Sequence, residues 1–253
     1  MRKFCLALMM ILPLLSVSCA DARVKQYKLQ VVNSFPHDRT SYTQGLFFYA
    51  GAMYESTGLN GKSTFRKVDI STGKALSKLT FDRKYFLEGS VEKDGNIYML
   101  TWQNQLAFVY DAATLEYKAS YSYPREGWGL TTDGKHLVAS DGSARLYFMD
   151  DNFRQVSTIT VKMDGRPVRY LNELEYIDGK IWANVYMSDL ILIINPESGN
   201  VEGVVDCTGL LPRQLQYEDT DVLNGIAYNP ADGSIYLTGK NWCRLYEVKI
   251  VEK

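Results

Sequence analysis

The sequence predicts an all-β protein, because hydrophobic runs recur in pairs that are joined by short turns ending in glycine. Glycine adopts the positive φ that a two-residue hairpin turn needs, and the flanking runs are rich in Val, Ile, Leu, Phe and Tyr. Each pair is therefore expected to form a β-hairpin. The five turns are Ala50-Gly51, Asp94-Gly95, Asp133-Gly134, Asp178-Gly179 and Asp232-Gly233.

The spacing of these turns indicates a repeat architecture. Successive turn glycines are 44, 39, 45 and 54 residues apart, which is the range of propeller blades and longer than leucine-rich or helical repeats. A second pair of strand-like runs follows each hairpin, as at 65–70 with 75–79 and at 190–194 with 201–205. Five repeats of four antiparallel strands predict a five-bladed β-propeller.

The two ends of the chain complete this count. The fifth repeat has only one strand-like run after its hairpin, at 245–250, whereas an unpaired run at 27–32 precedes the first hairpin. We therefore expect the N-terminal strand to close the last blade, which removes an exposed sheet edge. The propeller domain is predicted to span residues 27–253.

The amino-acid composition argues against one class of binding partner, nucleic acid. The chain is 46% hydrophobic and its net charge is -1, so it has the material for one domain with a large core and no electrostatic basis for binding nucleic acid. The many tyrosines agree with the preference of aromatic residues for strands. We expect a monomer.

The N-terminus reads as an export signal. Arg2 and Lys3 precede an apolar run at 4–15 that is too short for a permanent bilayer span, so residues 1–19 are predicted to be a signal peptide and 20–26 a short linker. The segment 16–19 resembles a bacterial lipobox ending at Cys19, although Ser16 stands where Leu is usual. Simple cleavage at the small residues 18–20 is the alternative. The predicted location is the periplasm, or the outer membrane through a lipid on Cys19.

Two cysteines remain in the predicted mature domain, Cys207 and Cys243. An exported protein reaches a compartment that permits disulfides, and both cysteines are expected at the same rim of the propeller. Sequence does not fix the distance between their Cα atoms, so a disulfide and two free thiols remain equal alternatives.

Counting from the turns gathers polar and aromatic residues at one mouth of the central channel. The first strand of each blade lines the axis, so residues seven before each turn glycine and seven after it should converge. The residues before the turn glycines are Gln44, Glu88 and Asn172, with Trp128 and Asn224 in a slightly shifted register. The residues after the turn glycines are Gly58, Trp102, Asp141, Tyr186 and Lys240.

This set is typical of a small-molecule pocket, which has an apolar wall and a few convergent polar groups. Propeller channels are often polar and wet, so a solvated rim explains any one of these residues equally well. As a set, Phe86, Trp102, Trp128 and Tyr186 beside the carboxyl group of Glu88 favour a binding site. The sequence has no GxSxG, Walker or HExxH motif, and His37 and His136 lie far apart in the repeat, which argues against a zinc site or a Ser-His-Asp triad. We interpret His37 as structural.

The chain resembles the glutaminyl-peptide cyclotransferases of the plant and bacterial type between about Val31 and Val248. That family consists of five-bladed propellers that convert the N-terminal Gln of peptides to pyroglutamate and release ammonia. The motifs that carry the likeness are Phe35-Pro36-His37-Asp38, Thr43-Gln44-Gly45-Leu46, Tyr54-Glu55-Ser56-Thr57-Gly58, Glu88-Gly89, Leu100-Thr101-Trp102, Glu126-Gly127-Trp128-Gly129-Leu130, Ser140-Asp141-Gly142-Ser143, Leu171-Asn172-Glu173-Leu174-Glu175-Tyr176, Ala183-Asn184-Val185, Asp221-Val222-Leu223-Asn224-Gly225-Ile226-Ala227-Tyr228 and Thr238-Gly239-Lys240.

The resemblance implies roles for individual residues. The family's acid/base falls on Glu88, and the other site positions fall on Tyr42, Gln44, Phe86, Trp102, Trp128, Asn172, Tyr186 and Lys240. We expect Asn172 or Lys240 to stabilise an oxyanion, and Glu126 to help bind the substrate amine. Leu87 stands where the family has Gly, which is expected to shift the backbone of Glu88, and Tyr186 replaces a Trp in the pocket wall.

Two other functions remain as alternatives. A lactonase-like hydrolase would use Glu88, Asn172, Asn224 and Asp141 as oxygen ligands of Ca²⁺, and a non-catalytic surface propeller would use the aromatic pocket as a ligand clamp. The cyclotransferase reading implies no cofactor, no catalytic metal and peptide or protein substrates with N-terminal Gln. It is compatible with a structural Ca²⁺ in the channel.

Overall fold

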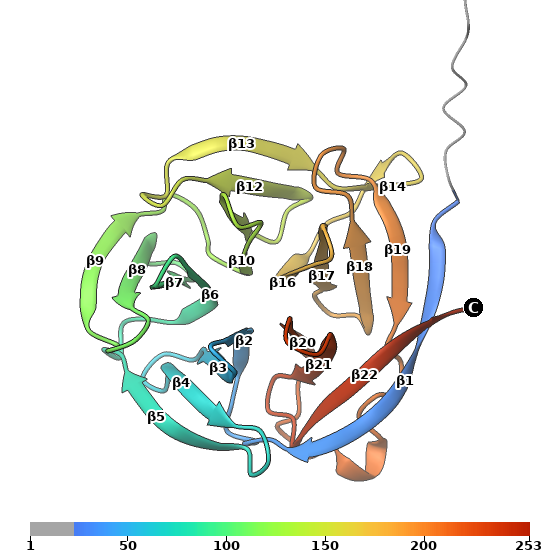
Figure 1. Ribbon diagram of the computed structural model, residues 1–253, viewed down its shortest axis with the longest axis horizontal. Coiled ribbons are helices and arrows are strands. Elements are labelled where there is room, and N and C mark those ends of the chain that lie inside the picture. The colour runs from blue at the N-terminus through green and yellow to red at the C-terminus, as the bar shows by residue number, and fades with distance from the viewer. Residues whose placement is uncertain (1–22) are drawn as a thin grey trace, which may run out of the picture.

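The computed structural model describes residues 23–253, which form sheets arranged in a ring around a central axis (Figure 1). The predicted signal peptide at 1–19, the predicted lipid attachment at Cys19 and the first residues of the predicted linker lie outside the described residues. Strand β1 (Lys25–Pro36) begins two residues before the predicted start of the propeller domain. Among residues 23–253, no helix has the length and apolar character needed to cross a bilayer.

Three sheets each contain four antiparallel strands in sequence order, as expected for propeller blades. In each, the first strand lies nearest the axis and the fourth lies at the outside (Figure 1). The first sheet contains β2 (Thr43–Tyr49), β3 (Ala52–Thr57), β4 (Thr64–Asp69) and β5 (Lys74–Thr80). The second contains β6 (Leu87–Lys93), β7 (Asn96–Thr101), β8 (Leu106–Asp111) and β9 (Tyr117–Ser122), and the third contains β10 (Leu130–Thr132), β11 (Leu137–Ser140), β12 (Arg145–Met149) and β13 (Gln155–Thr160).

The remaining long strands form one eight-stranded sheet in the order β16-β17-β18-β19-β1-β22-β21-β20. Strand β1 pairs antiparallel with β22 as expected, from Tyr27 opposite Glu252 to Pro36 opposite Arg244. It also pairs in parallel with β19 over Lys25–Lys28, which the sequence did not predict. The strands are β16 (Leu171–Ile177), β17 (Lys180–Val185), β18 (Leu190–Ile194), β19 (Val201–Asp206), β20 (Leu223–Asn229), β21 (Ser234–Gly239) and β22 (Arg244–Glu252).

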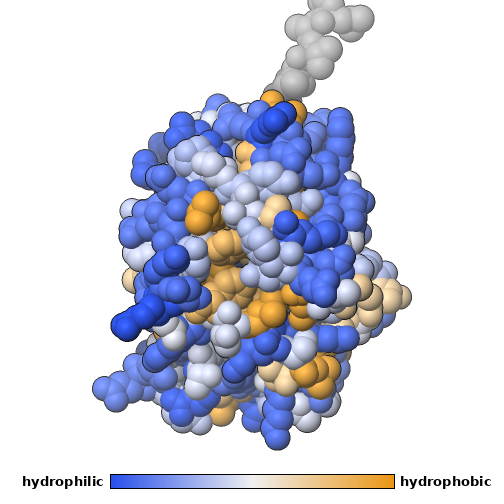
Figure 2. Space-filling view, turned by 90° about the vertical axis from the view of Figure 1, so that its left-hand side faces the viewer, coloured by the Kyte–Doolittle hydropathy of each residue, from blue (hydrophilic) through white to orange (hydrophobic). Residues whose placement is uncertain are grey.

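Two short elements lie in the connections. The small hairpin of β14 (Lys162–Met163) and β15 (Arg166–Pro167) precedes β16, and a single 3₁₀ turn, η1 (Arg213–Leu215), lies in the long connection before β20. Seen from the side of β9, the outer face is mostly hydrophilic, with apolar side chains gathered near its middle (Figure 2).

The turn chemistry is confirmed in three of the five hairpins. At Ala50-Gly51, Asp94-Gly95 and Asp178-Gly179 both residues have positive φ, between 48° and 78°, which is the type I′ geometry. At the turns that contain Gly134 and Gly233 only the glycine has positive φ, and four residues separate the paired strands, 133–136 and 230–233. The expectation of a two-residue turn was wrong there, although the hairpins form.

Glycines allow the inner strands to approach one another near the axis. A Cβ atom on Gly89 would lie 2.4 Å from the backbone N of Leu130, and one on Gly129 would lie 2.0 Å from the carbonyl oxygen of Asn172. Such distances exclude any side chain at these positions, so only glycine allows the backbones to approach this closely. The close approach brings the first residues of β6, β10 and β16 together.

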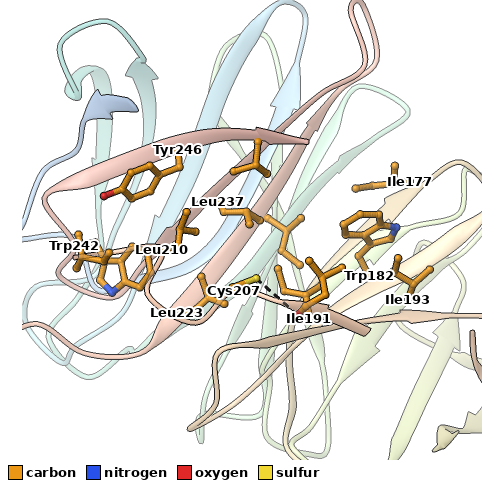
Figure 3. Packing of buried hydrophobic residues seen from close by; sticks show 14 residues of the cluster. Ile177, Trp182, Ile191, Ile193, Cys207, Leu210, Leu223, Leu237, Trp242 and Tyr246 are labelled. Atoms are coloured by element: carbon orange, nitrogen blue, oxygen red, sulfur yellow. Dashed lines mark hydrogen bonds between the residues drawn. The ribbon is translucent and has the colours of Figure 1, made fainter. Parts of the chain in front are cut away.

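Hydrophobic clusters fill the space between neighbouring sheets. In the cluster of Figure 3, Trp182 and Ile193 of one blade-like unit pack near Leu237 and Tyr246 of the next, with Cys207 between them. Cys207 is buried and Cys243 is partly buried, and both are free thiols. The disulfide alternative is therefore not realised, and Cys207 serves as a small apolar core residue.

Two buried glutamates on β16 tie three inner strands together. The carboxylate of Glu173 accepts hydrogen bonds from the backbone N–H groups of Ile226 at 2.9 Å and Leu46 at 3.4 Å, and Glu175 accepts one from Tyr228 at 2.9 Å. Burial raises the pKa of both groups, that of Glu175 to about 8. Glu175 is therefore a buried hydrogen-bond acceptor between two inner strands.

These pKa shifts predict a pH-dependent stability. The folded state favours protonated Glu175, so this stabilisation is complete below the pKa of the unfolded chain, about 4.3, and is lost as pH rises through about 8. Glu175→Gln keeps a neutral acceptor for the N–H of Tyr228. We expect its melting temperature to exceed that of the wild type at pH 9 by about 3–8 °C, for a gain of about 1–3 kcal/mol, and by much less at pH 5, where little of the stabilisation has yet been lost.

Thermal unfolding followed by circular dichroism at both pH values checks this prediction. Glu197→Gln, at an exposed position in a turn, is the control and should change neither melting temperature. A Glu175→Gln advantage of equal size at pH 5 and pH 9 would contradict the assignment.

Candidate functional site

A cavity of about 250 Å³ opens where the inner strands begin, and all nine site positions implied by the family resemblance line it. The predicted convergence of distant segments is therefore observed for these nine. Its volume suits one amino-acid side chain rather than a polymer. The lining residues are Tyr42, Gln44, Phe86, Glu88, Trp102, Trp128, Asn172, Tyr186 and Lys240.

Each lining residue is placed by the repeat. Tyr42, Phe86 and Trp128 lie just before inner strands, Gln44, Glu88 and Asn172 lie within them, and the remaining three follow the second strand of a sheet. A backbone hydrogen bond joins the residue before an inner strand to the residue after the second strand of the same sheet, since the N–H of Trp102 donates to the carbonyl of Phe86 at 2.9 Å. The cavity thus combines residues from every sheet of the ring.

Aromatic rings form the walls of the cavity. The rings of Phe86 and Trp102 meet edge to face with centroids 5.5 Å apart, and those of Trp128 and Tyr186 do so at the same distance. Gly58 lies against Phe86, and a Cβ on it would lie 2.2 Å from that ring. The walls therefore leave an apolar space around a few polar groups.

Four buried polar side chains face this space, and three of them have no hydrogen-bond or ion-pair partner among the described residues, although the ammonium group of Lys240 lies 4.8 Å and 5.2 Å from the ring centres of Tyr42 and Tyr186. Within residues 23–253, no hydrogen bond or salt bridge engages the carboxyl group of Glu88, the amide group of Asn172 or the ammonium group of Lys240, although each residue is at most 4% exposed. Gln44 is held at its carbonyl oxygen by Nδ2 of Asn224, at 3.3 Å. Partner-free polar groups in a largely apolar cavity are poised to bind a polar ligand.

The pKa values follow from this burial. Burial raises the pKa of Glu88 well above its usual range; the charge of Lys240 opposes the shift and that of Glu126 adds to it. Burial lowers the pKa of Lys240, against the attraction of Glu88 and Asp221. A carboxyl group with a raised pKa beside a cation is suited to exchanging protons near neutral pH.

Glu126 does not line the cavity, and its expected contact with a substrate amine is not supported by its position. Instead its Oε2 accepts hydrogen bonds from Nε1 of Trp102 at 3.0 Å and from Nε1 of Trp128 at 3.2 Å. It therefore fixes the orientation of two walls of the cavity.

Asp221 is the functional contact that sequence reasoning missed. Its Oδ2 accepts a hydrogen bond from the hydroxyl group of Tyr42 at 2.8 Å, and its charge acts on Lys240, whose Nζ lies 4.8 Å from the centre of the Tyr42 ring. Asp221 begins the motif quoted for the fifth repeat and lies just before β20, where Tyr42 lies before β2. In the repeat Tyr42 corresponds to Val222, because the carbonyl of Tyr42 accepts from the N–H of Gly58 as that of Val222 accepts from the N–H of Lys240. Counting along the repeat therefore does not single out Asp221.

Three other residues expected at the mouth do not line the cavity. Asp141 accepts a hydrogen bond from the hydroxyl group of Tyr147 at 2.8 Å, and Asn224 lies beneath Gln44, with Nδ2 donating to the carbonyl of Thr43 at 2.9 Å. Gly58 packs against the ring of Phe86 and does not line the cavity. The oxygen ligands expected of a lactonase-like site thus do not surround one position, and residues 23–253 contain no cluster of three or more His, Cys, Asp or Glu suited to a metal.

The replacement of glycine by Leu87 leaves Glu88 in the cavity. The side chain of Leu87 is fully buried in the cluster that contains Phe65 and Met99, on the other side of β6. The pairing of β6 with β7 shifts register between Leu87 and Ser90, so an irregularity at this point, rather than simple alternation along the strand, sets the direction of Glu88, which lines the cavity. The expected shift of the Glu88 backbone does not remove it from the pocket.

His37 belongs to a buried ion cluster that contacts Thr43 of β2 through Glu55. Its Nε2 lies 3.1 Å from Oε1 of Glu55, and Arg66 bonds the other oxygen of Glu55 and also Asp38. Burial would raise the pKa of Glu55, but Arg66 and His37 lower it to about 2. The cluster supports the structural interpretation of His37.

Comparison with known proteins places the chain in a family. The model of the glutamine cyclotransferase family matches residues 4–250, and the chain belongs to this family. It is 41% identical over 241 residues to a glutaminyl-peptide cyclotransferase of Arabidopsis thaliana, an alignment that covers 93% of this chain and 75% of the plant protein. The crystal structure of Myxococcus xanthus glutaminyl cyclase superposes with a TM-score of 0.85 at 33% identity, covering 91% of this chain and 100% of that one.

The role of Glu126 leads to a stability prediction. Glu126→Ala leaves the indole N–H groups of Trp102 and Trp128 without their acceptor, so we expect the free energy of unfolding in urea to fall by about 1–2 kcal/mol. Gln103→Ala removes only the exposed amide that bonds the other oxygen, at 3.3 Å, and should cost less than about 0.5 kcal/mol. Equal losses of unfolding free energy in the two variants would contradict the view that Glu126 holds Trp102 and Trp128 in place.

Proposed function

We propose that the cavity is the active site of a glutaminyl-peptide cyclotransferase, an acyltransferase that converts the N-terminal Gln of peptides and proteins to pyroglutamate. Membership of the glutamine cyclotransferase family supports this activity. The observation that carries the assignment of the site is the set of three buried polar groups, on Glu88, Asn172 and Lys240, that converge on an aromatic cavity and have no hydrogen-bond or ion-pair partner within the part of the chain that the structure describes.

We further propose that the ring is a five-bladed propeller. The eight-stranded sheet divides into β16 to β19 and β20, β21, β22 and β1, which are joined only by the short parallel pairing of β1 with β19. Each half then has four antiparallel strands, like the other three sheets.

The reaction brings two groups of one residue together. The α-amino nitrogen of Gln bonds to the side-chain amide carbon Cδ, the bond from Cδ to the amide nitrogen breaks, and ammonia leaves. The reacting groups are tethered, so holding them in a folded conformation supplies much of the rate. The aromatic walls are placed to enforce that conformation.

Glu88 moves the proton in this scheme. The attacking amine loses a proton to the Glu88 carboxylate, which returns it to the departing nitrogen so that neutral ammonia leaves. This double role requires a pKa near the working pH, and burial shifts the pKa of Glu88 in that direction. Lys240 and Asn172 are assigned to the oxyanion that develops on the amide oxygen, and Gln44 to orienting the substrate.

Export is proposed from the first residues of the chain. The basic pair Arg2-Lys3 and the apolar run that follows support secretion with removal of residues 1–19 or lipid attachment at Cys19. Intact-mass analysis of the protein from membrane and soluble fractions separates the two forms.

Glu88→Gln tests the acid/base assignment. An amide cannot accept the proton, so we expect kcat for a Gln-initiated peptide to fall by about 10²–10⁴-fold with the fold retained. Mass spectrometry of the peptide follows the loss of ammonia. Glu92→Gln, on the same strand but outside the cavity, is the control; near-normal turnover of Glu88→Gln would remove Glu88 from its role.

The pH profile tests the charges around Glu88. The carboxylate must be ionised to accept a proton, so kcat/KM falls as pH drops through its raised pKa. Glu126→Gln removes a negative charge that raises this pKa, so the acid limb should move to lower pH. Lys240→Met removes a positive charge that lowers it, so the residual activity should show the limb at higher pH. The pKa of the free substrate amine is the same in the assays of the wild type and both variants, so it cannot cause a difference between their pH profiles. If the three profiles fall at the same acidic pH, the assigned effects of Glu126 and Lys240 on Glu88 are wrong.

A chelator separates this function from the lactonase-like alternative. A cyclotransferase of this design uses only protein groups, so pre-incubation with EDTA and assay in metal-free buffer should leave kcat/KM unchanged. A loss restored by Ca²⁺ would instead support a metal-dependent reaction.

A further inference from the structure

Two exposed apolar side chains stand beside the mouth of the cavity. Met187, which is 72% exposed, directly follows the wall residue Tyr186, and Tyr170, which is 55% exposed, lies two positions before Asn172. The backbone N–H of Tyr186 donates to the carbonyl of Tyr170 at 2.8 Å, so the two segments are held side by side. Tyr170 and Met187 therefore both lie next to the wall residue Tyr186, on neighbouring segments at this part of the rim.

The backbone at this rim adopts an uncommon conformation. Tyr170 has φ 65° and Met187 has φ 63°, in the left-handed region that bulky residues seldom occupy. Leu59 and Asn241, which follow Gly58 and Lys240 as Met187 follows Tyr186, also have positive φ, so at Met187 the conformation belongs to the turn after the second strand of the repeat. Here the conformation presents two apolar side chains to solvent rather than to a core.

The rest of the mouth has a different character. Tyr217, the other large exposed aromatic residue near this end, is covered by the guanidinium of Arg39 at 3.7 Å, and Arg39 pairs with Asp219. On another side Glu126 bonds Gln103. Polar and charged groups therefore occupy those parts of the rim, whereas no other described ring stacks on Tyr170.

We infer that Tyr170 and Met187 form a subsite for the side chain of the second residue of the substrate, and that this subsite favours apolar side chains. The inference rests on the proposed function: with the α-amine and side chain of Gln enclosed in the cavity, the α-carbonyl must lead the peptide out across the rim. Met is flexible and adaptable, so the subsite selects a class of large apolar residues rather than one of them.

The test compares two dipeptide amides, Gln-Phe-amide and Gln-Gly-amide. The variants are Met187→Asn and Tyr170→Asn, because Asn removes the apolar surface and tolerates positive φ. We expect the wild type to prefer Gln-Phe-amide, and each variant to lower the ratio of the two kcat/KM values by about 3–10-fold, mainly through KM of Gln-Phe-amide. Leu76→Asn, at an exposed apolar position on the outer strand β5, is the matched control and should keep the wild-type ratio.

The outcomes separate the subsite from the activity itself. An unchanged ratio in both variants, or equal losses on both substrates, would overturn the subsite while leaving the cyclotransferase activity standing. Failure of the wild-type protein to cyclise either substrate would reject the proposed function, and the subsite with it.

Discussion

Closure of the ring is the constraint on which the site depends. Strand β1 pairs with β22 along most of its length and with β19 at its start, so the first described residues are tied to the last. The inner strands are thereby held close enough for Glu173 of β16 to accept hydrogen bonds from β2 and β20. The cavity draws residues from every sheet around the axis, and opening the ring at any point would separate them.

Within this frame, two buried carboxyl groups show how surroundings decide chemistry. Glu55 is bonded by Arg66, His37 and Thr43, and its pKa is about 2, so it remains a fixed negative charge that supports the structure. Glu88 is equally buried but has no such partner, and its pKa rises. A buried carboxyl group without a partner is costly, and such costs are characteristic of sites that bind or react. The aromatic walls and Glu126, which fixes their tryptophans, maintain this environment.

Much of the fold and of the site was predictable because both follow the repeat. Turn glycines with strand-like flanks gave the hairpins, and counting from those glycines gathered Gln44, Glu88, Trp102 and Lys240, which do line one cavity. The same counting also selected Asp141 and Asn224, which lie nearby but are engaged with Tyr147 and Gln44. A count along the chain gives the end of a strand at which a residue lies, and it does not give the direction of a side chain or its partners.

The sequence alone determined the local elements and their order, because glycine geometry and the alternation of apolar residues act within a few positions of the chain. It also determined which chemical groups reach the axis, because the repeat places equivalent positions at one end. Only the tertiary structure decided that β1 joins β19, that Glu126 clamps two tryptophans, that Asp221 holds Tyr42 and that Cys207 and Cys243 stay apart. Each of these depends on distances between segments far apart in the chain, which packing fixes and local sequence does not.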